Sequence, residues 1–107
     1  MTDLEITKRC AEAMGLPFIP EPRPQPSSMI RVLFITEAQA YDPFHDDAQA
    51  MALVKKFMLD CWFDPGRGSW KAQYSVEAQS ESDDLNRAIC ECVAKMQEAK
   101  SGQRDAA

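Results

Sequence analysis

The chain has 107 residues but no long apolar run, no cluster of basic residues and only one histidine. Its short apolar runs, such as residues 32–35, do not approach the roughly 20 residues that cross a bilayer, so no transmembrane helix is expected. The N-terminal sequence MTDLEITKRC is polar and lacks the pattern of a secretory signal. We therefore expect a cytoplasmic protein with no membrane partner, whose four cysteines stay reduced.

The charge balance, 12 basic against 17 acidic residues, gives a net charge of −5 and argues against some classes of partner. Binding to nucleic acid or to an anionic membrane needs clustered cations, and here the basic residues are scattered, so neither is expected. The acidic residues are concentrated in two stretches, which favours a basic protein as the partner. The predicted partner-binding residues are Asp42, Asp46, Asp47, Glu81, Asp83 and Asp84.

The single histidine is the first candidate for chemistry. His45 lies beside Asp42, Asp46 and Asp47, a set that could bind a divalent metal or orient a general base. The interpretation we favour is structural: Asp42 caps a helix, and the other two acids interact with the positive end of that helix. His45 is then a surface residue of the first turn.

The cysteines do not have the spacing of a metal site. Cys90 and Cys92 are two positions apart on a predicted helix, so their side chains diverge by roughly 200°. The sequence has no C-x-x-C pair, no G-x-S-x-G nucleophile motif and no phosphate-binding loop. We predict no catalytic residues, no metal and no cofactor, and therefore a protein that is not an enzyme.

Local signals predict one domain over residues 1–100 and a flexible polar tail over residues 101–107. Thr2 and Glu5 have the spacing of a capping box, and Pro43 after Asp42 is typical of a helix start. The predicted fold class is α+β, a compact sandwich of about three helices on a small, mainly antiparallel sheet, in the order α-β-α-β-β-α. In chain order the elements are a helix over 3–14, a proline-rich connector over 16–28, a strand over 29–35, a helix over 45–56, strands over 57–64 and 69–77, and a helix from about residue 82.

The hairpin and the last helix have the clearest periodicity. On the helix, apolar residues recur at helical spacing: Leu85, Ala88, Ile89, Cys92, Val93 and Met96. In the hairpin, the alternation of a strand places Trp62 on the opposite face from its neighbours Cys61 and Phe63. Either a second helix covers that face or it is exposed. The aromatic and basic residues of the hairpin could instead hold a small ligand, with Trp62, Arg67, Trp70, Lys71 and Tyr74 as the predicted set.

Several segments resemble a known family. They are FHDDAQAMALV at residues 44–54, Trp70 on a predicted strand, DLNRAICEC at residues 84–92 and, at the start, AEAMGL at residues 11–16. Over about residues 3–98 the chain resembles the phage ABA-sandwich domain family. The resemblance implies a compact α+β sandwich, no catalytic residues, and a location in the cytoplasm of a phage-infected or lysogenic bacterium. The five prolines between residues 16 and 29 depart from the more strand-like stretch that relatives commonly have there.

The resemblance and the missing catalytic set together predict a non-enzymatic phage or prophage accessory protein. We expect it to bind a host protein that is basic or binds nucleic acid, for example as an anti-defence inhibitor of a CRISPR or other immunity complex. The alternatives are a binder or sponge of a small nucleotide-type ligand, and a structural or assembly protein of the virion. A homodimer, and a contact role for residues 16–28, stay open.

Overall fold

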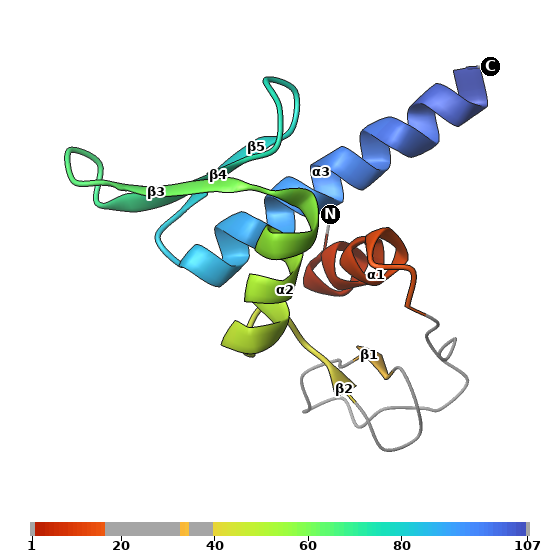
Figure 1. The fold of residues 1–107 in the computed structure, drawn as a ribbon, viewed down its shortest axis with the longest axis horizontal. Coiled ribbons are helices and arrows are strands. Elements are labelled where there is room, and N and C mark those ends of the chain that lie inside the picture. The colour runs from red at the N-terminus through yellow and green to blue at the C-terminus, as the bar shows by residue number, and fades with distance from the viewer. Residues whose placement is uncertain (1, 17–32, 35–39, 107) are drawn as a thin grey trace.

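The computed structural model describes residues 2–16, 33–34 and 40–106, which form helices and short antiparallel strands (Figure 1). Strands β1 and β2 pair with each other, and β3, β4 and β5 form a second sheet in that order. The predicted α+β class is confirmed. Within the described ranges no helix is both long enough and apolar enough to cross a membrane. The elements are α1 (Asp3–Ala13), β1 (Leu33–Phe34), β2 (Ala40–Tyr41), α2 (Asp47–Phe57), β3 (Asp60–Asp64), β4 (Ser69–Gln73), β5 (Gln79–Ser82) and α3 (Leu85–Ala106).

The predicted element order is wrong in two places. The structure adds β2, which pairs with β1, and β5, which pairs with β4. The strand predicted over 69–77 ends at Gln73, because the chain then turns and the amide of Tyr74 donates to the carbonyl of Ala78 at 2.9 Å. Strand β5 has the polar sequence QSES, without the β-branched or alternating apolar residues that mark a strand. Residues 17–32 and 35, which include most of the predicted connector and strand, lie outside the described residues.

Helix α3 lies at the centre of the fold, between the three-stranded sheet and helices α1 and α2 (Figure 1). The predicted apolar stripe of this helix is buried from Ala88 on, with Ile89, Val93 and Met96 at most 3% exposed, and Leu85 at its start is half-buried. Cys90, outside that stripe, is fully buried as well, because α1 packs on the opposite side of α3 from the sheet. The helix runs through Ala106, so the segment predicted as a polar tail is helical over most of its length.

The cysteines of α3 face different layers, which confirms the predicted divergence of their side chains. The Cys10 thiol of α1 donates to the Cys90 carbonyl at 3.5 Å, and the Cys92 thiol donates to the Ala78 carbonyl beside the sheet at 3.2 Å. A hydrogen bond with Cys10 and burial raise the pKa of Cys90, and burial raises the pKa of Cys92 from 9.0 to about 11. Cys90 and Cys92 are therefore protonated at neutral pH and act as small apolar side chains.

The start of α1 confirms the predicted capping box, and the start of α2 corrects a prediction. Thr2 and Glu5 exchange side chain-to-backbone hydrogen bonds at 3.2 and 3.3 Å. The cap of α2 is Asp46, not Asp42: its carboxylate accepts the amides of Ala48 and Gln49 at 2.9 and 3.2 Å. Pro43 does not enter the first turn of α2, because the backbone carbonyl of residue 42 closes a separate turn by accepting the amides of residues 45 and 46. Several aspartates in one short stretch can all cap, and the sequence does not say which one does.

The three-stranded sheet has one face against α3 and one open face. Trp62, Lys71 and Glu81 are paired across the three strands and share the open face. Trp62 is 41% exposed, so of the two alternatives for its face the exposed one is correct. The physical reason is that α1 and α2 pack on α3, which leaves a single helical layer next to the sheet in the described part of the chain.

Candidate functional site

The beginnings of α2 and α3 are joined by one side chain. The side-chain nitrogen Nδ2 of Asn86, in the first turn of α3, donates to a carboxylate oxygen of Asp47 at 2.8 Å and to the backbone carbonyl of Phe44 at 3.3 Å. Because Asn86 and Asp47 are 39 positions apart in the chain, this contact brings the two predicted acidic stretches together. We call the resulting surface, which consists of Asp42, Asp46, Asp47, Asp83 and Asp84, the acidic junction.

Arg87 connects the start of α1 to the same place. Its guanidinium lies 3.0 Å from a carboxylate oxygen of Asp3 and 3.7 Å from one of Glu91, and it stacks over the ring of Phe44 at 5.4 Å. The hydrogen bond to Asp3 is the main cause that raises the pKa of Arg87, with further contributions from Glu91 and Asp84. The positive charge of Arg87 is therefore already paired with carboxylates, and its guanidinium lies against an aromatic ring.

Besides Asp47, each carboxylate of the acidic junction is held in place by a local hydrogen bond. Asp46 caps α2, and Asp84 caps α3 by accepting the amide of Arg87 at 3.1 Å. Asp42 lies 2.8 Å from Nδ1 of His45. Asp83 accepts the Ser82 hydroxyl at 3.4 Å. Four of the five carboxylates are exposed, and only Asp42 is half-buried, so the negative charge faces solvent.

Glu81, the remaining predicted partner-binding residue, is not part of the acidic junction. It lies on β5, where its carboxylate is 3.3 Å from Arg67 and 3.6 Å from Lys71. The prediction grouped Glu81 with Asp83 and Asp84 because they are neighbours in sequence. The strand that the sequence analysis missed places Glu81 on the open sheet face instead.

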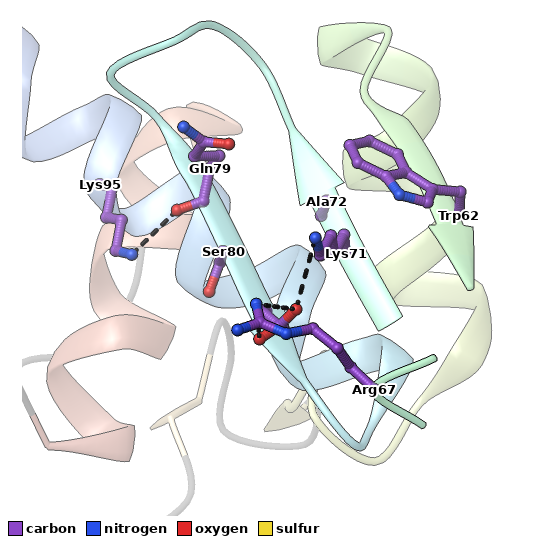
Figure 2. A pocket seen from close by; sticks show the side chains of 8 residues that line it. Trp62, Arg67, Lys71, Ala72, Gln79, Ser80 and Lys95 are labelled. Atoms are coloured by element: carbon purple, nitrogen blue, oxygen red, sulfur yellow. Dashed lines mark hydrogen bonds and ion pairs between the residues drawn. The ribbon is translucent and has the colours of Figure 1, made fainter. Parts of the chain in front are cut away.

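A shallow depression of about 260 Å³ lies on the open face of the sheet (Figure 2). It contains three residues of the predicted ligand set, namely Trp62, Arg67 and Lys71. We call it the sheet depression; its lining residues are Trp62, Arg67, Lys71, Ala72, Gln79, Ser80, Glu81 and Lys95.

Two residues of the predicted ligand set lie elsewhere. Trp70 precedes Lys71 on β4 and therefore lies on the other face of the sheet. There it packs edge-on against Phe63, with ring centroids 5.1 Å apart. Tyr74 follows β4 in the bend that leads to β5, and it is not among the lining residues. Lys95 and Gln79 were missed, because the sequence gives no sign that α3 passes beside a strand at residues 79–82.

The described residues contain no group of three or more histidine, cysteine and carboxylate side chains that could hold a metal ion. His45 has a carboxylate partner in Asp42, the pairing that could orient a base; the imidazole is exposed and Asp42 is half-buried. Burial raises the pKa of Cys61, as it does for Cys92, which is the reverse of the shift that activates a nucleophile.

No family model, no curated protein and no solved structure matches the chain. The resemblance to the phage ABA-sandwich domain family therefore stays a prediction.

Proposed function

We propose that this protein is a binding protein whose acidic junction docks onto a basic surface of a host protein. The observation that carries the proposal is the bond from Asn86 to Asp47, which joins two separate acidic stretches into one surface. Complementary charge at such a surface steers encounter and excludes partners of the wrong charge.

The geometry of the carboxylates favours binding over a purely solvating role. Their hydrogen bonds to helix amides, to His45 and to Asn86 hold them in defined positions. Because they are already ordered, less side-chain entropy is lost when a partner binds. Arg87, the cation in the same region, is paired with Asp3 and leaves the surface acidic.

The resemblance to phage proteins supports a bacterial partner. Nucleic-acid-binding proteins, including the nucleases and complexes of bacterial defence, carry basic surfaces that bind phosphates. A small protein with a net charge of −5 can occupy such a surface. The proposed role is therefore that of a phage or prophage accessory protein that acts on a host protein in the bacterial cytoplasm.

The proposal can be tested by capture from bacterial lysate followed by mass spectrometry. The variant Asp42→Lys/Asp83→Lys reverses two charges of the acidic junction but leaves the caps Asp46 and Asp84, and the bond from Asn86, in place. The matched control Asp60→Lys/Glu77→Lys makes the same change in net charge at exposed positions on β3 and in the β4–β5 bend.

The wild-type protein and the control should retain the same basic protein in stoichiometric amount, and the junction variant should lose it. Capture of no stoichiometric partner by the wild type would contradict the proposal. Equal capture by the junction variant would also contradict it, because the partner would then bind elsewhere.

A further inference from the structure

We propose that the sheet depression binds a small aromatic ligand that carries a phosphate, with a nucleoside monophosphate as the simplest member of the class. This second site lies on β3, β4, β5 and the turn between β3 and β4 that carries Arg67, with one residue from α3, whereas the acidic junction lies at the helix starts. It therefore does not depend on the proposed partner protein.

Charge is the first argument for an anionic ligand. The lining contains the cations Arg67, Lys71 and Lys95 against the carboxylate of Glu81, and the carboxylate of Asp64 lies 3.5 Å from Lys71, so three positive charges face two negative ones, a net +1. The chain as a whole has a net charge of −5. The depression is thus a locally basic site on an acidic protein, and it can concentrate a small anion.

The contacts of Glu81 show how an anion would be held. One nitrogen of Arg67 reaches both carboxylate oxygens of Glu81, at 3.3 and 3.4 Å, and Lys71 is 3.6 Å from the same carboxylate. Charge-assisted hydrogen bonds are usually about 2.7–2.9 Å long, so Glu81 is held loosely. A phosphate has more oxygens and more charge than a carboxylate, and it can displace Glu81 from both cations.

The walls of the depression suit an aromatic group beside that phosphate. Trp62 is 41% exposed and stands directly across from Lys71 in the strand register. On the other side Lys95 donates to the carbonyl of Gln79 at 2.9 Å and lies along β5 (Figure 2). An exposed indole next to cations is the arrangement on which a nucleobase stacks.

The size of the depression limits the ligand. Its volume of about 260 Å³ is below the roughly 300–1,000 Å³ of pockets for drug-sized molecules. This fits one nucleotide rather than a dinucleotide. A nucleic acid strand would in addition meet the negative charge of the rest of the protein, which opposes binding of a polyanion.

The test is isothermal titration of the full chain with AMP at low salt. Glu81→Gln removes the competing carboxylate and should tighten AMP binding about threefold to tenfold, since it deletes one negative charge close to the phosphate. The matched control Glu77→Gln makes the same change in the β4–β5 bend, outside the depression, and should alter the affinity less than twofold. Because the expected effect is a gain of binding, a loss of folding cannot imitate it.

Arg67→Gln/Lys71→Gln should abolish AMP binding in protein that circular dichroism shows to be folded, and Trp62→Ala should weaken it about tenfold. The proposal is overturned if AMP does not bind, or if Glu77→Gln tightens binding as much as Glu81→Gln. It is also overturned if inorganic phosphate binds as tightly as AMP, since Trp62 would then have no role. An oligonucleotide that binds far more tightly than AMP would point to a nucleic-acid surface and refute a small-molecule site.

Discussion

The bond from Asn86 to Asp47 should measurably couple the two helix starts. Asn86→Ala removes a 2.8 Å hydrogen bond to a carboxylate and a 3.3 Å hydrogen bond to the Phe44 carbonyl. Hydrogen bonds to charged groups contribute about 1.5–3 kcal/mol and neutral ones about 0.5–1.5 kcal/mol, with the lower ends appropriate for exposed groups. Alanine has a better helix propensity than asparagine, which offsets roughly 0.5 kcal/mol of the lost stability. The net loss of stability should therefore be about 1–2 kcal/mol.

Thermal or urea unfolding of four proteins measures this coupling. They are the wild type, Asn86→Ala, Asp47→Ala and the double variant, which together form a double-mutant cycle. The single variant Asn86→Ala should lower Tm by about 4–16 °C, given about 4–8 °C per kcal/mol for a domain of this size. The cycle should give a coupling of about 0.5–1.5 kcal/mol, because it cancels the separate effects of each residue on its own helix.

A coupling of zero, within about 0.3 kcal/mol, would refute the reasoning. The starts of α2 and α3 would then be held together by other contacts, and the acidic junction would lose the interaction on which its definition depends. Asp83→Ala serves as a control for the loss of a carboxylate. It should show no coupling to Asn86→Ala, because its hydrogen bond is to Ser82.

Three further predictions concern the core. Tyr41→Phe should raise the free energy of unfolding by about 1 kcal/mol in chemical denaturation, because the buried Tyr41 hydroxyl has no hydrogen-bond partner among the described residues; a large loss would contradict this. Burial raises the pKa of Cys92 from 9.0 to about 11, so the folded state holds this proton more tightly than the unfolded state. Cys92 alone should therefore lower stability by at most about 2.7 kcal/mol between pH 9 and 11, measured as the difference between wild type and Cys92→Ala over that range. A thiol reagent should modify only half-buried Cys61 in the folded protein, and labelling of Cys10 or Cys90 before unfolding would argue against the packing of α1 on α3.

The parts of the fold with local signals could be predicted from the sequence. The capping box at Thr2 and the positive φ of Gly15 mark both ends of α1, and the apolar stripe of α3 is buried as expected. These signals depend on residues within one or two helical turns of each other. The hairpin of β3 and β4 follows in the same way from its alternating residues and its turn.

The parts that depend on tertiary context could not be predicted. Strand β5 is polar and pairs because β4 and α3 lie beside it, not because of its own residues. Without β5, Glu81 could only be grouped with its sequence neighbours, and Lys95 gave no sign that it reaches the sheet.

The same division between local signals and tertiary context applies to the candidate surfaces. The aspartates of the acidic junction were named from the sequence, but the bond that joins them spans 39 positions, and no local sequence pattern marks it. Trp62, Arg67 and Lys71 line one depression because they belong to one hairpin. Trp70 lies on the other face, because the predicted set was drawn from the hairpin's aromatic and basic residues without regard to the strand face that each occupies.

The most direct test of the central claim is the affinity of the captured partner, once purified, for two variants with the same net charge. Asp42→Lys/Asp83→Lys should weaken binding at least about tenfold relative to wild type, whereas Asp60→Lys/Glu77→Lys should stay within about twofold. Equal weakening by both variants would mean that net charge alone drives the association. An unchanged affinity for the junction variant would place the binding surface elsewhere and contradict the account.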